Sequence, residues 1–225
     1  MMLLGYFVVY VLILTLVFNV ATVLLCRRLR VGVTEFGVFY GPKLARWQVG
    51  GCEVSLGLLP TGGFVGVDQV AMKRFPVGAR VLMAGIGPLA TASVGLLLLG
   101  EEGFKHFLTS ALAHLGPGTL HPLTVGVDCV ARVAVMAELS FWRGLGVMAA
   151  VNTALALLPL TPMPMYRVLA TICGRGMTEK EEGKDGMTLV QMLEVAGAML
   201  VFVAGLLWGL AVVVFFWRLV MWEGG

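Results

Sequence analysis

The stretch that decides the fold is Leu3–Arg30, LLGYFVVYVLILTLVFNVATVLLCRRLR, in which no charged residue occurs before Arg27. A helix needs about 20 apolar residues to cross the hydrocarbon core of a bilayer. The run is longer than the apolar part of a signal peptide, and no basic residue precedes it. We therefore interpret residues 3–25 as a retained transmembrane helix.

The composition of the chain predicts several such helices. Of its 225 residues 59% are hydrophobic and 13% are charged, and the mean hydropathy is +0.93. Soluble domains are about 45–50% apolar and about 25% charged. The apolar runs 79–99, 144–163 and 189–217 predict three further spans, so the fold class expected is an all-α membrane bundle of about four helices, forming one domain over residues 1–225. The basic residues lie beside apolar spans, which excludes a nucleic-acid surface.

The segments between these spans carry weaker patterns. Residues 33–67 alternate between apolar and polar with glycine and proline turn signals, which predicts a small membrane-associated sheet or pair of hairpins. Prolines 159, 162 and 164 crowd the end of the third span, so that span should pack inside the bundle and end as extended chain. In the segment 100–143 we expect an amphipathic helix over 104–115, ended by Gly116-Pro117-Gly118, and an interfacial or bundle-packed stretch over 123–142.

The distribution of lysine and arginine predicts the orientation. Both residues are concentrated in the segments 26–78 and 164–188. By the positive-inside rule these loops are cytoplasmic, and both termini lie outside the cytoplasm. We expect an integral membrane protein that is located in the bacterial inner membrane.

Three later motifs follow the first span in a recognisable order. They are LLPTGGFV at 58–65, AGIGPLA at 84–90, and Asn152 followed by LLPLTPMP at 157–164. With the arginines that follow the first span, this order and spacing resemble the site-2 protease family of intramembrane zinc metalloproteases. The segment between residues 100 and 123 is too short to hold the PDZ insertion of that family.

The resemblance also shows which positions have changed. In the family, His-Glu-x-x-His occupies the place of Phe18–Thr22, because histidines at i and i+4 share one helix face and the glutamate acts as base. The family's aspartate ligand falls on Pro164. The resemblance therefore implies a catalytically inactive member with no catalytic residue and no bound zinc, because none of Phe18, Asn19, Thr22 and Pro164 supplies a zinc ligand or a base.

Other family features are retained. In active members the corresponding elements hold an extended substrate strand, so the resemblance implies a candidate partner-binding groove made of Asn19, Gly62, Gly63, Phe64, Asn152 and Pro159. For the amides of Asn19 and Asn152 two roles stay open, a hydrogen bond inside the bundle or contact with a ligand. Gly205 and Gly209 form a GxxxG motif, which is a candidate oligomer face.

The function expected is that of a non-catalytic membrane interaction or assembly subunit that binds transmembrane partners. One alternative is an active metalloprotease with unusual ligands, although no histidine occurs in residues 1–105. Another alternative is a subunit of a membrane transport or lipid-binding complex.

Overall fold

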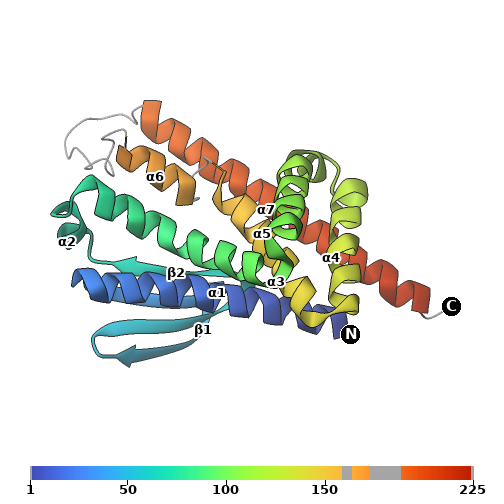
Figure 1. The fold of residues 1–225 in the computed structure, drawn as a ribbon, viewed down its shortest axis with the longest axis horizontal. Helices are drawn as coiled ribbons and strands as arrows, with labels where there is room; N and C mark the ends of the chain where they lie inside the picture. Colours follow the sequence, from blue (N-terminus) through green and yellow to red (C-terminus); the bar gives the residue numbers. More distant parts are fainter. Residues whose placement is uncertain (1, 159–163, 173–188, 224–225) are drawn as a thin grey trace.

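The computed structural model of the chain describes residues 2–158, 164–172 and 189–223. Most of these residues are helical, and a small sheet lies against one side of the helices (Figure 1). In chain order the elements are α1 (Met2–Leu29), β1 (Val33–Val49), β2 (Cys52–Val67), α2 (Gln69–Lys73), α3 (Val77–Leu120), the π-helical turn η1 (Pro122–Gly126), α4 (Val127–Leu139), α5 (Phe141–Ala156), α6 (Pro164–Ile172) and α7 (Leu189–Glu223).

Three of these helices are long and apolar enough to cross a membrane, namely Leu3–Leu29, Val77–Leu120 and Val195–Met221. They correspond to the first, second and fourth predicted spans, and the expected membrane bundle with a small sheet is confirmed. The third predicted span, 144–163, is the 16-residue helix α5, which is shorter than the length needed to cross. Helix α5 ends before the prolines, and it is largely buried, as expected. Residues 159–163, where extended chain was predicted, lie outside the described residues.

Helix α3 is divided by Gly100, whose backbone is non-helical (φ 71°, ψ 173°). A positive φ is readily available only to glycine, so the chain turns sharply there. The part before the kink runs alongside α1, and the part after it turns away (Figure 1). The ring of Phe104 then lies against Gly95, where an added Cβ would be 2.6 Å from Phe104 Cε2.

The helix predicted over residues 104–115 is present, but it ends later in the chain than predicted. It continues through Gly116, Pro117 and Gly118 to Leu120. Trp208 of α7 lies directly over Gly118, since an added Cβ there would be 2.4 Å from its ring, and its indole Nε1 donates to Thr119 Oγ1 at 3.0 Å. Tertiary packing has therefore overridden the local helix-breaking signal. The stretch predicted as interfacial or bundle-packed contains α4, which packs against α5 and α7.

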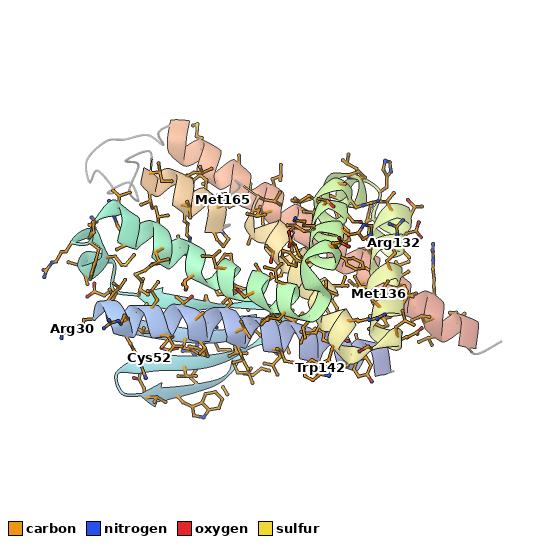
Figure 2. All side chains as sticks on the ribbon, in the orientation of Figure 1. Arg30, Cys52, Arg132, Met136, Trp142 and Met165 are labelled. Carbon is orange, nitrogen blue, oxygen red and sulfur yellow. The ribbon has the colours of Figure 1, made fainter. Side chains whose placement is uncertain are left out.

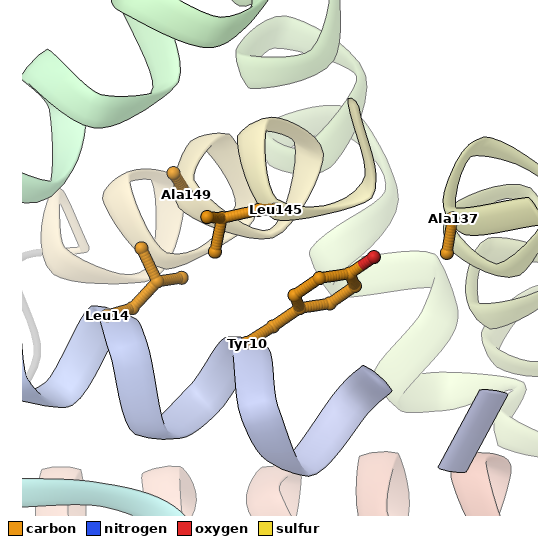
Figure 3. Packing of buried hydrophobic residues seen from close by; sticks show 5 residues of the cluster. All are labelled: Tyr10, Leu14, Ala137, Leu145 and Ala149. Atoms are coloured by element: carbon orange, nitrogen blue, oxygen red, sulfur yellow. The ribbon is translucent and has the colours of Figure 1, made fainter. Parts of the chain in front are cut away.

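The main apolar core lies between α1, α4 and α5. Figure 3 shows Tyr10 and Leu14 of α1 facing Leu145 and Ala149 of α5, with Ala137 of α4 beside the tyrosine ring. The Tyr10 hydroxyl is buried without a hydrogen-bond partner. The core therefore holds α1 by shape and apolar contact at its N-terminal end.

The sheet lies beside the C-terminal part of α1. Strands β1 and β2 pair as an antiparallel sheet, with Val49 opposite Cys52 at the hairpin turn and Val33 opposite Val67 at the open end. Strand β1 bends between its two halves, where Phe39 and Gly41 have positive φ. Gly37 pairs with two residues of β2, with Ser55 on one side and with Phe64 on the other. Residues 35–38 therefore form the middle of the sheet. The sheet predicted over residues 33–67 is confirmed.

Candidate functional site

Phe18, which the resemblance assigns to the first position of the metal motif, packs its ring against helix α3. A Cβ added at Gly87 would lie 2.5 Å from Phe18 Cε2, so only a glycine leaves room for the ring. Gly87 belongs to the Gly-Pro-x-Ala motif singled out in the sequence. That motif therefore forms the close contact between α1 and α3.

Asn19, which the resemblance assigns to the position of the family's catalytic base, joins α1 to the sheet. Its side chain is fully buried, and Nδ2 donates to the backbone carbonyl of Gly37 at 2.9 Å. The other amide atom, Oδ1, is buried and has no hydrogen-bond partner. A buried amide bonded to a strand carbonyl contributes to holding the helix and the sheet in register, while its unpaired oxygen carries a desolvation cost.

Gly63 is the point where β2 meets α1. An added Cβ there would be 2.5 Å from Thr15 Cγ2, 3.0 Å from Asn19 Nδ2 and 2.4 Å from the carbonyl oxygen of Gly37. Thr15 is itself buried. Gly63 thus lets β2 approach the polar face of α1 closely, whereas Gly37 leaves room for the ring of Phe64.

Thr22, which the resemblance assigns to the position of the second histidine, does not take part in this contact. Its hydroxyl donates to the carbonyl of Phe18 at 2.9 Å, one turn earlier in the same helix. This local bond satisfies the hydroxyl within an apolar helix. Of the three α1 positions that the resemblance assigns to the motif, Phe18 has no polar side-chain atom, Asn19 Nδ2 donates to the sheet, and the Thr22 hydroxyl donates to its own helix.

Two aromatic side chains close the sheet over the glycines. The Phe64 ring lies against Gly37 and stacks on the ring of Tyr40, with centroids 5.9 Å apart. The Tyr40 hydroxyl donates to the carbonyl of Gly63 at 2.8 Å. Burial raises the pKa of Tyr40, and the charge of Arg167 on α6 acts in the opposite direction. The hydroxyl is therefore a neutral donor at physiological pH.

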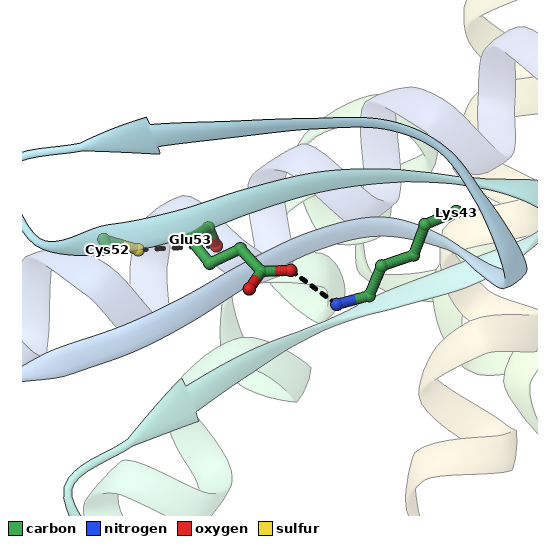
Figure 4. A network of polar contacts seen from close by, with 3 residues as sticks. All are labelled: Lys43, Cys52 and Glu53. Carbon is green, nitrogen blue, oxygen red and sulfur yellow. Dashed lines mark hydrogen bonds and ion pairs between the residues drawn. The ribbon is translucent and has the colours of Figure 1, made fainter.

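The hairpin beyond this site is held by a surface ion pair. Figure 4 shows Lys43 Nζ reaching Glu53 Oε1, at 2.6 Å, across the hairpin. The hydrogen bond from Lys43 and its charge lower the pKa of Glu53. The carboxylate is therefore ionised at neutral pH, and the pair contributes modestly to keeping the hairpin closed.

The remaining predicted site residues are not all brought together. Asn152 is half-buried on α5, and its side chain makes none of the described hydrogen bonds. Pro164 begins α6, which packs against α3. Pro159 lies outside the described residues. Asn19, Gly63 and Phe64 meet around Gly37, with Gly62 beside the Tyr40 ring, whereas the convergence of Pro164 with the α1 positions stays a prediction.

The side chains at the family's metal positions do not fit zinc. Zinc in proteins takes Cys, His, Asp or Glu ligands. Within residues 2–158, 164–172 and 189–223, no group of three or more such residues is placed to hold a metal ion. The Asn19 amide donates to the carbonyl of Gly37 through Nδ2, and its Oδ1, a neutral oxygen, is buried without a hydrogen-bond partner.

Sequence reasoning missed three residues of this site, namely Gly37, Thr15 and Tyr40. A single glycine inside an alternating strand is a sign of close backbone approach, and Gly37 carried that sign. Thr15 is one of few polar residues in its helix. The hydrogen bond of Tyr40 spans 23 residues and had no local signal.

Comparison with known proteins places the chain in a family. The family model described as Peptidase family M50 matches residues 6–167, which include α1, the sheet, α3, α5 and the start of α6. No curated protein matches the chain. The match covers well over half of the sequence and all the motifs that resemble the site-2 proteases. The chain is therefore a member of peptidase family M50, the site-2 protease family.

Proposed function

We propose that this M50 member is a non-catalytic membrane protein that binds transmembrane partners as an interaction or assembly subunit. The observation that carries the proposal is the hydrogen bond from Asn19 to Gly37. At the position where the family needs a base facing a metal-bound water, this chain has an amide that joins α1 to the sheet. Catalysis needs that position free, whereas this fold uses it as a structural contact.

The elements around the changed positions support retention of a binding surface. The sheet glycines, the aromatic pair Tyr40–Phe64 and the Gly87 contact keep α1, the sheet and α3 closely packed. The half-buried amide of Asn152 makes no described hydrogen bond within the bundle. An unsatisfied amide in an apolar environment is costly, so it suits contact with the backbone or side chain of a partner segment.

Photo-crosslinking tests the binding surface. A photoreactive phenylalanine is placed at Phe64 or at Asn152, and as a matched control at Leu97, whose side chain is 84% exposed on α3. After irradiation of native membranes, we expect positions 64 and 152 to yield the same protein adduct and position 97 to yield none. Equal labelling from all three positions would contradict a defined surface.

Metal analysis tests the loss of catalysis separately. Purified protein should contain far less than one zinc per chain, because the changed positions offer no ligand set. One tightly bound zinc that is lost on substitution of residues 18–22 would support the alternative of an active protease with unusual ligands.

A further inference from the structure

Five arginines gather at the end of the molecule where α1 ends, α2 lies and α3 begins (Figure 1). We call them the basic collar: Arg27, Arg28, Arg30, Arg74 and Arg80. Arg30 ends α1 in a left-handed conformation (φ 58°), and the N–H of Val31 bonds back to the carbonyl of Cys26 at 2.9 Å. This C-cap turns the chain towards the sheet and leaves the arginines at the rim of the bundle.

A small apolar cluster brings the three parts of the collar together. Cys26, Val31 and Met83 are buried in it, and side chains from α2 and from the open end of the sheet pack around them. Arg80 lies one turn before Met83 on α3, and Arg74 is the C-cap of α2. The collar is therefore a built feature of the tertiary structure.

Few acidic residues lie in the same two segments of the sequence as these arginines. Residues 26–35 and 68–80 contain only Glu35 and Asp68 as acids. Asp68 Oδ1 already accepts from the backbone N–H groups of Val70 and Ala71, which caps α2. No described salt bridge involves the arginines of the collar, and the Nε of Arg80 is buried without a hydrogen-bond partner. A guanidinium without an acidic partner can bind the oxygens of a phosphate group through its planar set of N–H donors.

An exposed apolar stripe leads to the collar along α1. Leu16, Val20 and Leu24 are exposed at intervals of four residues, and Arg28 continues the same helix face. Val70 of α2 and Val77 at the start of α3 are also exposed beside the collar. A ligand that fits both features has a negatively charged phosphate at one end and an apolar chain at the other.

We infer that the basic collar binds the headgroup of an anionic phospholipid, with an acyl chain along the Leu16–Leu24 face of α1. Juxtamembrane clusters of lysine and arginine attract anionic lipids, at roughly 1 kcal/mol per cation near the surface. The collar sits where two membrane-crossing helices end, so a bound headgroup reaches α1, α2 and α3 together. This binding site is separate from the one around Asn19.

The test uses the full-length protein in mild detergent, titrated with fluorescent phosphatidylglycerol or phosphatidylcholine. The variant is Arg28→Gln/Arg74→Gln. The matched control, Arg132→Gln/Arg143→Gln, removes the same charge from exposed positions on α4 and α5; Figure 2 shows Arg132 far from Arg30. For the collar variant we expect the affinity for phosphatidylglycerol to fall about tenfold or more, and for the control less than twofold.

Two further measurements separate the competing explanations. Phosphatidylglycerol should raise the melting temperature of the unsubstituted protein more than phosphatidylcholine does, and millimolar glycerol phosphate should not displace it. Equal weakening in the variant and the control, or equal effects of the two lipids, would overturn the proposal. Displacement by glycerol phosphate would also overturn it, because the site would then recognise free phosphate.

Discussion

Helices α1 and α7 are almost equally apolar, with mean hydropathies of 2.6 and 2.7 over their most apolar 18 residues. They differ in how much of their surface is buried against other elements. Helix α1 buries Tyr10, Leu14, Thr15, Asn19 and Cys26 and contacts α3, α4, α5 and both strands. Helix α7 buries only Ala211 and Phe215 among its described side chains, and its first half exposes large side chains such as Met199 and Phe202.

The difference in burial between α1 and α7 follows from which of their polar and small residues contact other elements. On α1, Asn19 meets the carbonyl of Gly37 and Phe18 meets Gly87. On α7, Trp208 meets Gly118 and Thr119, while Gly205 and Gly209 face open space. In an apolar environment, close packing and hydrogen bonds decide which helices associate, because general hydrophobicity no longer discriminates between faces. The following substitutions test this comparison.

The largest effect should come from restoring the family's residues with Phe18→His, Asn19→Glu, Thr22→His and Pro164→Asp. Without metal, the free energy of unfolding should fall by several kcal/mol, because a carboxylate is buried against the Gly37 carbonyl and the Phe18 packing is lost. If the four positions meet, zinc should raise the melting temperature in detergent, since binding to the folded state stabilises it. A variant that folds without any zinc-dependent rise would show that Pro164 is not the third-ligand position.

The single variant Asn19→Glu is the matched control for this experiment. It should be destabilised, and zinc should not rescue it. The new side chain would lie against the carbonyl of Gly37, where an acceptor oxygen replaces the N–H donor of Asn19, so the hydrogen bond is lost. Unchanged stability of this variant would contradict burial of this position.

Gly87→Ala should be the next most damaging change, with a loss of about 1–3 kcal/mol from overpacking against the Phe18 ring. Gly85→Ala is its control on the same helix, because an added Cβ there meets nothing within 4 Å. The control should gain up to about 1 kcal/mol from helix propensity. Thermal unfolding, followed by a thiol dye that reacts as buried Cys26 becomes exposed, compares the two. Equal stability of the two variants would mean that α1 and α3 do not meet at Gly87.

Trp208→Phe should have a smaller effect, about 0.5–1.5 kcal/mol, because it removes the hydrogen bond to Thr119 but keeps an aromatic ring over Gly118. Thr119→Val should cost a similar amount, and the double variant should cost less than the sum of the two. Full additivity of the two losses would argue against a direct bond. The same melting experiment measures all three.

The smallest effect on folding should come from Gly205→Leu and Gly209→Leu. Neither glycine has a neighbour within 4 Å of an added Cβ, so the monomer should keep its stability or gain slightly. We expect these changes to weaken self-association, measured by energy transfer between labelled copies in bilayers, if this face pairs two chains. A marked loss of monomer stability would contradict the exposed position of this part of α7.

Much of the architecture could be predicted from local sequence. The long apolar runs determined the membrane-crossing helices, because the bilayer requires about 20 apolar residues per helix. Alternation and turn residues determined the sheet over 33–67, and the order of the motifs determined the family. The sequence also supports the prediction that the zinc-binding positions of the family are substituted here, because ligand chemistry depends on residue type.

The tertiary structure alone decided what the changed residues do instead. Nothing near Asn19 in the sequence indicates that its amide bonds to Gly37, and nothing near Gly118 indicates that Trp208 allows a helix to continue past Pro117. The collar likewise exists only because Cys26, Val31 and Met83 pack together. Local sequence reports the preference of each segment for lipid, helix or strand. Which faces meet depends on shape and hydrogen-bond complementarity between segments far apart in the chain, and this is settled only when the chain folds.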